Sequence, residues 1–372
     1  MTKVAEINRV INDFVWVRIG LILLLGGGLL MTVCTGVFQV THIGHWFKHT
    51  LISVFRKDSG VTKTDDKNTI TQFQSLCTAL AATIGTGNIA GVSAAIVLGG
   101  AGAVFWMWVA AFLGMMTKFS ENVLGIYFRR RNNQGEWSGG PMYFLKDGLG
   151  KKKGMKIPGA VLAVLFAIFT ILASFGIGNM GQVNKIVLNI KSAFFAGVQD
   201  PQIGGMSVIA LAIGAVLLVI TALIVIGGLQ RIAAVAEKVV PLMAIMYVVG
   251  SLVVFFVNID KVGAMFSVIF RCAFDFKSVA AAGTGLLIKE AITQGCKRGV
   301  FSNEAGLGSA VLAHSSSNVK EPVRQGMWGI FEVFVDSFVV CTMTAIVVLS
   351  SGYIDLSTGY VAAGATVDDA TL

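Results

Sequence analysis

The sequence predicts an all-α protein that crosses a lipid membrane about eight times. Three observations support this fold class: the composition, the recurrence of apolar runs and the placement of positive charge. Of the 372 residues, 55% are hydrophobic and 13% are charged, and the mean hydropathy is +0.77. Soluble domains carry about 25% charged residues, so much of the apolar surface is expected to face lipid.

Apolar runs of roughly 20 residues or more, the length needed to span a bilayer, recur along the chain. The first run has no small-residue cleavage site and is too long for a signal-peptide core, so it is expected to be retained. No Pro-rich or low-complexity linker divides the chain, which predicts a single membrane domain over residues 1–372. The predicted spans are 14–40, 70–98, 102–128, 158–190, 205–227, 239–258, 276–297 and 325–351.

Lys and Arg residues alternate between the loops as expected of a multi-pass protein, because cytoplasmic loops are enriched in them. The loops 48–68, 129–157, 228–240 and 297–324 hold 19 of the 29 such residues, and the N-terminal tail and the other loops hold 5. This bias places the N-terminus outside. The segment 299–320 is too polar to span and is expected at the cytoplasmic surface. The basic clusters should face lipid headgroups, and no motif indicates a nucleic-acid partner.

Two predicted spans carry a Gly-Thr-Gly triplet near their middle, at residues 85–87 and 283–285. The two spans are predicted to run in opposite directions, as an inverted repeat requires. Glycine admits positive φ and resists a fixed helical backbone, so both helices are expected to unwind there. Unwound N–H groups can bind a carboxylate, and freed carbonyls can bind a sodium ion. The alternative is that both triplets serve only close helix packing.

The fourth predicted span contributes three side chains with helical spacing. Phe175, Asn179 and Gln182 stand at i, i+4 and i+7 and are expected on one face. Amides buried in a membrane are either helix-packing groups or binding groups. The same span contains G-x-G-x-x-G at 176–181, but no strand precedes it, so it does not predict a dinucleotide site.

Several segments resemble hallmark motifs of the sodium/alanine symporter family, also described as alanine/glycine:cation symporters. The most specific begins Gly-Gly-Ala-Gly-Ala-Val-Phe-Trp-Met-Trp at Gly99 and ends at Gly114. The others are Ala-Ala-Thr-Ile-Gly-Thr-Gly-Asn-Ile-Ala-Gly at 81–91, Gly-Gly-Pro-Met-Tyr at 139–143 and Arg-Gly-Val-Phe-Ser-Asn-Glu-Ala-Gly at 298–306. The resemblance covers nearly the whole chain.

This resemblance implies a LeuT-like inverted repeat preceded by one extra helix. The extra helix would be 14–40, the first five-helix repeat 70–258, and the second repeat would begin within 276–372. That second repeat is expected to be incomplete, because family members usually continue into three more core helices. The resemblance also implies sodium-coupled symport of alanine or glycine across the plasma (inner) membrane. We expect a monomer that uses sodium as coupling ion and has no other cofactor.

Roles for individual residues follow from the same resemblance. The amides of Thr86 and Gly87 would take the substrate carboxylate. The carbonyls of Ala81 and Ile84 would bind sodium, together with the side chain of Asn88. The predicted substrate site as a whole consists of Gly85, Thr86, Gly87, Phe175, Asn179, Gln182, Gly283, Thr284 and Gly285.

Two other functions remain open at this point. One is a proton-coupled amino-acid transporter, and the other is a truncated membrane relic or sensor that keeps the binding half, because the sequence ends at Leu372. An enzyme is not predicted, since no nucleophile–base pair or metal motif is visible. Lys118 and Glu121, at i and i+3, are expected to pair. No unpaired charge is expected at mid-span, which favours small neutral amino acids as substrates.

Overall fold

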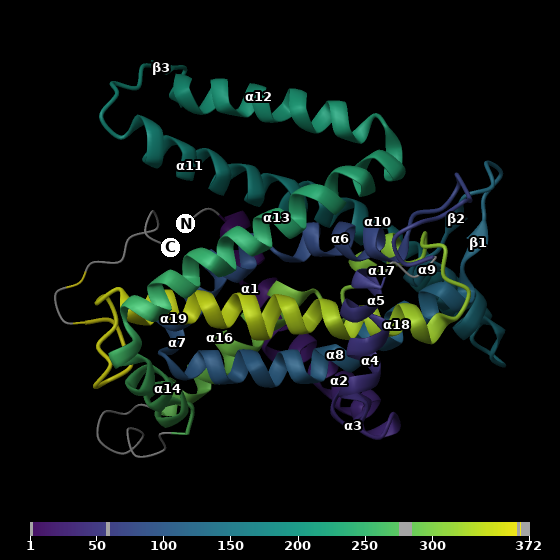
Figure 1. Ribbon diagram of the computed structural model, residues 1–372, viewed down its shortest axis with the longest axis horizontal. Helices are drawn as coiled ribbons and strands as arrows, with labels where there is room; N and C mark the ends of the chain where they lie inside the picture. The colour runs from purple at the N-terminus through teal and green to yellow at the C-terminus, as the bar shows by residue number, and fades with distance from the viewer. Residues whose placement is uncertain (1–2, 57–59, 275–284, 363–364, 366–372) are drawn as a thin grey trace.

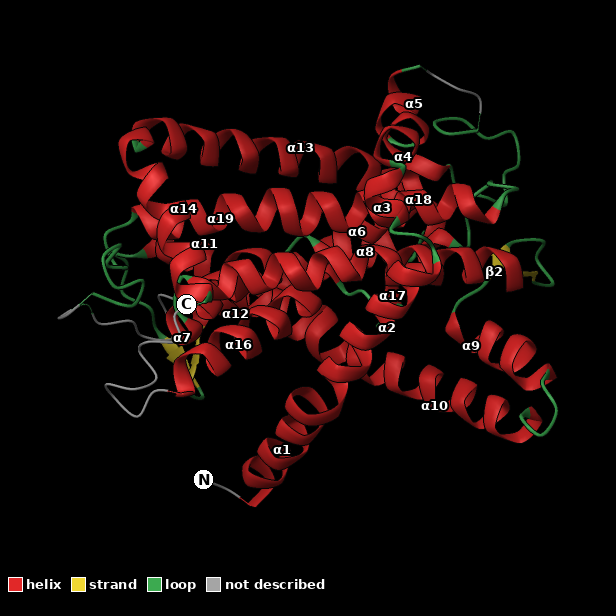
Figure 2. Ribbon diagram, turned by 90° about the horizontal axis from the view of Figure 1, so that it is seen from below, coloured by secondary structure: helices red, strands yellow, loops and turns green. Residues whose placement is uncertain are grey.

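The protein was analysed as a computed structural model, which describes residues 3–56, 60–274, 285–362 and 365. Within these ranges the chain is built almost entirely from helices, which confirms the all-α prediction (Figure 2). Two short antiparallel hairpins interrupt them: β1 (Arg130–Arg131) with β2 (Trp137–Ser138), and β3 (Gln202–Ile203) with β4 (Met206–Ser207).

Among the described residues, six helices are long and apolar enough to cross a membrane, or seven if one bent helix counts as a single span. They are Glu6–Cys34, Gln72–Thr83 with Gly87–Gly99, Gly102–Phe128, Lys156–Phe195, Val208–Val225, Gly228–Val257 and Pro322–Ser350. The seventh predicted span, 276–297, falls partly outside the described residues. Its visible part belongs to helix α16 (Gly285–Asn303), which carries Lys289, Glu290, Lys297 and Arg298 and is too charged to qualify.

The first span consists of α1 (Lys3–Asp13), the π-helical turn η1 (Phe14–Gly20) and α2 (Leu21–Cys34). It ends earlier than the predicted residue 40, because Gly36 and Val37 take positive φ and turn the chain. Three short helices follow: α3 (Phe38–Thr41), α4 (Ile43–His49) and α5 (Leu51–Phe55).

The next elements are the bent helix α6 (Gln72–Thr83), η2 (Gly87–Gly91) and α7 (Val92–Gly99), and then α8 (Gly102–Phe128). Short helical turns α9 (Pro141–Tyr143), η3 (Phe144–Gly148) and η4 (Leu149–Lys151) lead into a long interrupted helix. That helix consists of α10 (Lys156–Phe175), η5 (Gly176–Met180) and α11 (Gly181–Phe195). It is followed by α12 (Val208–Val225), α13 (Gly228–Val257) and α14 (Ile259–Ala273).

The last part of the chain is α16, α17 (Ser309–His314), α18 (Pro322–Val333), η6 (Phe334–Cys341) and α19 (Thr342–Ser350). The helix formed by α18, η6 and α19 runs through the middle of the molecule beside α8 and α16 (Figure 1). About half of its residues and of those in α8 are buried, whereas α11 and α12 form a hairpin without a buried residue.

Glycines allow α16 to approach α8 closely. A Cβ placed on Gly295 would lie 2.3 Å from the carbonyl oxygen of Ala103, and one on Gly299 would lie 3.2 Å from Met107 Cα. Small residues bring membrane helices into backbone contact in this way, because no hydrophobic effect drives helices together in lipid. The contact fixes the position of the segment that follows α16.

Arg129, the residue after α8, fixes the loop that follows α17. Its guanidinium donates to the carbonyl oxygens of Ser315 and Ser317, at 2.9 and 2.6 Å, and stacks 4.1 Å from the ring centre of Trp137. Burial lowers the pKa of Arg129 to about 10. The polar segment between α17 and α18 is therefore tied to the end of α8.

Candidate functional site

The helix predicted to unwind is broken at the predicted place. α6 and the η2–α7 segment are bent by 51° relative to each other, and Ile84 between them is extended with ψ 99°. The reason for the glycines differs from the prediction, since neither Gly85 nor Gly87 has a positive φ. Close approach explains Gly87, because a Cβ there would lie 3.2 Å from the backbone Cα of Ser302. A Cβ on Gly85 would lie 2.9 Å from Gln182 Nε2, at the movable end of that side chain.

The partner of this break is the segment from Ser302 to Gly308. Its backbone leaves the helical conformation with positive φ at Glu304, Gly306 and Gly308. Ser302 and Asn303 are 1% exposed. This part of residues 299–320, which are expected at the cytoplasmic surface, is therefore buried within the protein against α8 and η6.

Of the second Gly-Thr-Gly triplet, the structure describes one residue, which does not lie at this break. Gly283 and Thr284 are outside the described residues, and Gly285 is the first residue of α16. α16 runs antiparallel to α7, since Gly87 meets Ser302 and Gly99 meets Ala291. Seventeen residues of helix, roughly 25 Å at about 1.5 Å per residue, separate Gly285 from Ser302. The prediction that the two triplets lie at the same depth is therefore wrong for Gly285.

Of the three side chains predicted on one face of the fourth span, only Gln182 reaches the break. Its Oε1 accepts from the Thr86 amide at 3.4 Å. Phe175 is 64% exposed and Asn179 is exposed as well. The physical reason is the π-helical turn η5 between them, because an i→i+5 turn changes the phase of the helix and breaks the i, i+4, i+7 alignment.

The residues predicted to hold sodium lie on both sides of the break. Ile84 and Asn88 are buried, while the side chain of Ala81 is exposed one turn before the break. Asn88 Oδ1 accepts from the Gly85 amide at 2.9 Å. The Asn88 amide nitrogen donates to Asp336 Oδ1 at 2.7 Å, which brings a residue of η6 into the site.

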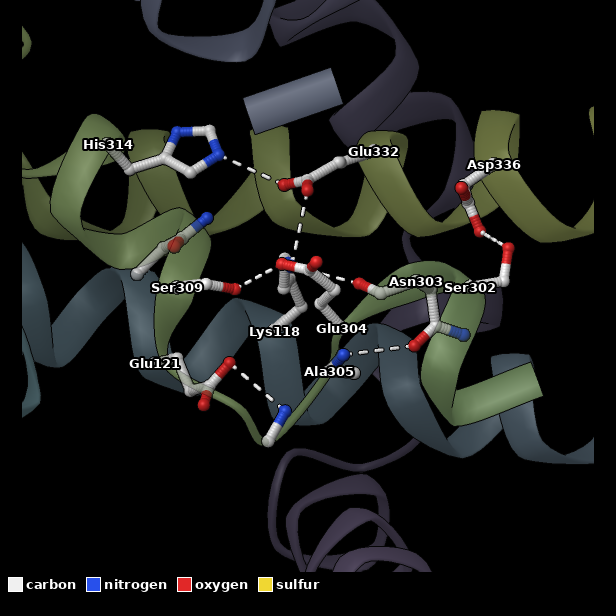
Figure 3. A network of polar contacts seen from close by, with 12 residues as sticks. Lys118, Glu121, Ser302, Asn303, Glu304, Ala305, Ser309, His314, Glu332 and Asp336 are labelled. Carbon is white, nitrogen blue, oxygen red and sulfur yellow. Dashed lines mark hydrogen bonds and ion pairs between the residues drawn. The ribbon is translucent and has the colours of Figure 1, made fainter. Parts of the chain in front are cut away.

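Asp336 is a site residue that the sequence interpretation missed. It is 0% exposed, and its Oδ2 accepts from Ser302 Oγ at 2.8 Å (Figure 3). The same oxygen accepts from Ser337 Oγ at 2.9 Å. An ionisable residue inside a spanning segment marks a functional site by default. Asp336 in the predicted span 325–351 was therefore a signal available in the sequence. The expectation of no unpaired charge at mid-span is wrong, since none of the ion pairs among the described residues includes Asp336.

A second buried network lies beside the first (Figure 3). Lys118 pairs with Glu332 at 3.2 Å, not with Glu121 as expected, and also donates to the carbonyl oxygen of Asn303 at 2.9 Å. Glu332 Oε2 lies 3.0 Å from His314 Nε2. Glu121 instead accepts from the Gly306 amide at 3.3 Å. Through Lys118 and Glu121, this network connects α8 to Asn303 and Gly306 in the segment opposite the break. The ion pair of Lys118 with Glu332 connects it to α18.

Comparison with known proteins identifies the family of the chain. A model of the "Sodium:alanine symporter family" matches residues 1–371. The sodium/alanine symporter AgcS of Methanococcus maripaludis is 45% identical over 352 residues, which cover 95% of this chain and 72% of that protein. The "Probable sodium/glutamine symporter GlnT" of Bacillus subtilis is 34% identical, with 94% of this chain and 67% of that protein covered.

A third relative is the amino-acid carrier protein AlsT of Bacillus subtilis, which is 36% identical, with 92% of this chain and 66% of that protein covered. The family match extends over nearly the whole chain and includes the broken helix, the segment opposite it and Asp336. The chain therefore belongs to the sodium:alanine symporter family, which is a family of multi-pass membrane transporters and not of enzymes.

Proposed function

We propose that the protein carries small neutral amino acids, alanine or glycine, into the cell together with sodium. Family membership supports sodium-coupled amino-acid symport, and the names of the relatives include both alanine and glutamine carriers. The proposal places the chain in the plasma (inner) membrane with its N-terminus outside, in keeping with the alternation of basic loops. It acts as a monomer in this proposal.

The observation that carries the proposal is the break between Thr83 and Gly87, which faces a second non-helical segment inside the protein. Non-helical backbone at membrane depth is tolerated where it is enclosed by protein or lines a cavity. Thr83 Oγ1 is buried and has no hydrogen-bond partner among the described residues. A buried polar atom without a partner costs free energy, so a ligand that supplies one is favoured here.

The substrate carboxylate would be held by the amides of Thr86 and Gly87 at the start of η2. Helix N-termini present N–H donors and a positive dipole end to anions. Because Gly85 and Gly87 carry no side chains, the ligand and Gln182 can approach the backbone directly. Gln182, which already accepts from Thr86, would exchange that weak contact for one to the substrate.

The cation would lie on the other side of the break. The carbonyls of Ala81 and Ile84 and the side chain of Asn88 are the proposed ligands, because carbonyls at the end of a half-helix suit sodium in transporters. Sodium bound next to the substrate carboxylate would favour its binding by Coulomb attraction. Transport of one would then depend on the other.

Uptake of labelled alanine into proteoliposomes containing the full chain tests the proposal. An inward sodium gradient should drive accumulation above the external concentration, and unlabelled glycine should compete. Replacement of external sodium by choline at constant pH should abolish accumulation. Uptake that is unchanged in choline and follows an imposed pH gradient would show proton coupling instead, and the absence of any alanine binding would refute the proposal.

A further inference from the structure

A pocket of about 350 Å³ lies beside the non-helical segment opposite the break. A pocket of this size can hold a small ligand or one end of a larger one. Its walls come from α2, α8, the turns α9 and η3, and α10, and none of its lining residues belongs to the proposed substrate and sodium sites. Its side chains are apolar except for Thr117, Ser120 and Glu121. The pocket is therefore a second place where a ligand could bind.

The charged residue in this lining, Glu121, has no ion pair in the part of the chain that the structure describes. Its Oε2 accepts from the Gly306 amide at 3.3 Å. Lys118, one turn earlier on α8, is paired with Glu332 at 3.2 Å and donates to the carbonyl oxygen of Asn303. Carboxylates inside spanning helices are usually paired and often functional. A cationic ligand in the pocket would give Glu121 its missing partner.

The depth of Glu121 in the membrane suits a lipid headgroup. α8 has 27 residues, which span roughly 40 Å, close to the thickness of a bilayer with its headgroup regions. Glu121 lies seven residues before the end of α8 at Phe128, roughly 10 Å along the helix axis. The headgroup region occupies about 5–8 Å of each face, so Glu121 lies close to the boundary between headgroups and hydrocarbon.

The pocket also opens towards lipid. Met31 on α2 and Leu124 on α8 line it, and both side chains are exposed although they belong to spanning helices. Phe144 and Phe166 form further parts of its apolar wall. An apolar chain can therefore enter between α2 and α10 without a loss of its lipid-like surroundings, while a polar end meets Glu121.

We propose that this pocket binds a membrane lipid whose headgroup carries a primary ammonium group, with the ammonium on the carboxylate of Glu121. A primary ammonium offers three N–H donors, and charge-assisted hydrogen bonds to a carboxylate are roughly twice as strong as neutral ones. A quaternary ammonium has the same charge but no N–H donor and is bulkier. Phosphatidylethanolamine and phosphatidylcholine differ in this group, and the pocket should prefer the former.

A bound lipid would act on the segment opposite the break. Glu121 already fixes the Gly306 amide, where the backbone has a φ of +93°, and Ser302 in the same segment packs against Gly87. An ammonium on the carboxylate adds a charge-assisted contact at this position. Occupancy of the pocket should therefore stabilise the arrangement in which this segment faces the broken helix.

Thermal unfolding of the purified full chain in mixed micelles tests this assignment. The micelles contain phosphatidylethanolamine, phosphatidylcholine or phosphatidylglycerol with the same acyl chains. A ligand that binds only the folded state raises the unfolding midpoint as its concentration rises. For the wild type, the midpoint should rise saturably with phosphatidylethanolamine. The half-saturating mole fraction should be about tenfold lower than for the other two lipids, the effect of one charge-assisted hydrogen bond.

Two substitutions test the carboxylate and the pocket separately. Glu121→Gln keeps an acceptor oxygen for Gly306 and should remove the preference for phosphatidylethanolamine over phosphatidylcholine. Gly27 lines the pocket from α2, and a Cβ placed on it has nothing within 4 Å. Gly27→Leu should therefore fill the pocket without a clash and abolish the preference as well. If Glu121→Gln does not fold, Gly27→Leu still decides the outcome.

Each substitution has a matched control. Gly26, next to Gly27 on α2, also has nothing within 4 Å of its hypothetical Cβ but does not line the pocket. Glu237 is another carboxylate on a spanning helix, and it accepts from Gln74 at 2.8 Å. Gly26→Leu and Glu237→Gln should both keep the wild-type preference for phosphatidylethanolamine.

Three outcomes would overturn the proposal. The first is an equal response of the wild type to phosphatidylethanolamine and phosphatidylcholine. The second is a preference retained in Glu121→Gln or in Gly27→Leu. The third is a rise with a free long-chain amine such as dodecylamine but none with phosphatidylethanolamine, which would assign the pocket to a soluble amine. Unfolding midpoints do not depend on alanine uptake, so the lipid site and the proposed function can fail independently.

Discussion

Lys118 Nζ lies 3.2 Å from Glu332 Oε1, and neither side chain is exposed to solvent. The pair joins α8 to α18 in the middle of the bundle, and the second carboxylate oxygen of Glu332 lies 3.0 Å from His314 Nε2. Lys118 also holds the carbonyl oxygen of Asn303, directly before the non-helical segment that faces the break. Two charges therefore position the backbone opposite the proposed substrate site.

Removal of one member of this pair should destabilise the protein strongly. Glu332→Gln leaves Lys118 buried and uncompensated, which costs about 3–5 kcal/mol in comparable cases. The double variant Lys118→Met/Glu332→Gln should lose less than the sum of the two single variants, because no unpaired charge remains. Thermal unfolding of the purified proteins measures this, with Glu237→Gln as control. Single variants that unfold at the wild-type temperature would contradict the prediction.

The glycine at the break should be required for substrate binding. A branched side chain at Gly87 would meet Ser302 Cα at 3.2 Å and the ring of Phe301 at 3.3 Å, so Gly87→Val should abolish alanine binding. Thr86→Ser keeps the amide and the hydroxyl and should be mild. Alanine affinity is measured on monodisperse protein of matched stability. Wild-type affinity in a folded Gly87→Val variant would show that the glycine serves packing alone.

Gln182 and Asn179 should differ in their importance although both are amides on the same interrupted helix. Gln182 touches the break at Gly85 and Thr86, whereas Asn179 is exposed. Gln182→Ala should lower alanine affinity by about tenfold, the effect of roughly 1.4 kcal/mol from a lost hydrogen bond, and Asn179→Ala should leave it unchanged. Equal losses in both variants would mean that the whole face of this helix lines the site.

Close packing of α16 on α8 should depend on Gly295. Its Cβ would lie 2.3 Å from a backbone oxygen that cannot move independently of α8, so Gly295→Ala should destabilise the protein by about 1–3 kcal/mol. Gly214 on α12 has nothing within 4 Å of its hypothetical Cβ, and Gly214→Ala should be neutral or slightly stabilising. Unfolding midpoints of the two variants provide the comparison, and equal midpoints would argue against the tight helix contact.

Charged amino acids should compete poorly with alanine. Glutamate would bring a second negative side chain near Asp336. Arginine would bring its cation towards the partly buried Arg298, whose Cδ lies 3.8 Å from the Cβ position of Gly91. Either charge would also lose its hydration. Competition against labelled alanine in the presence of sodium measures this. Inhibition by arginine or glutamate as strong as that by glycine would contradict it.

The sequence by itself determined the class of the protein and the position of one break. A helix that faces lipid must be apolar whatever its neighbours are, so each span can be recognised from its own hydrophobic run. Most spans were therefore predicted to within a few residues. The Gly-Thr-Gly triplet at 85–87 likewise lies at a real interruption, although neither glycine has a positive φ and Gly87 instead packs closely against Ser302.

Only the tertiary structure decided which segments meet at that break. The triplet at 283–285 has the same sequence as the one at 85–87. The antiparallel packing of α7 on α16 nevertheless brings Ser302 to the break and leaves Gly285 at the other end of α16. Because the π-helical turn η5 changes the phase of its helix, Gln182 reaches the break and Phe175 and Asn179 do not. Asn88 and Asp336, which form a hydrogen bond, are 248 residues apart in sequence. The periodicity of a sequence reflects the environment of a single helix. The pairing of distant polar groups depends instead on how the helices pack against one another. Close contacts such as those of Gly295 and Gly299 determine this packing.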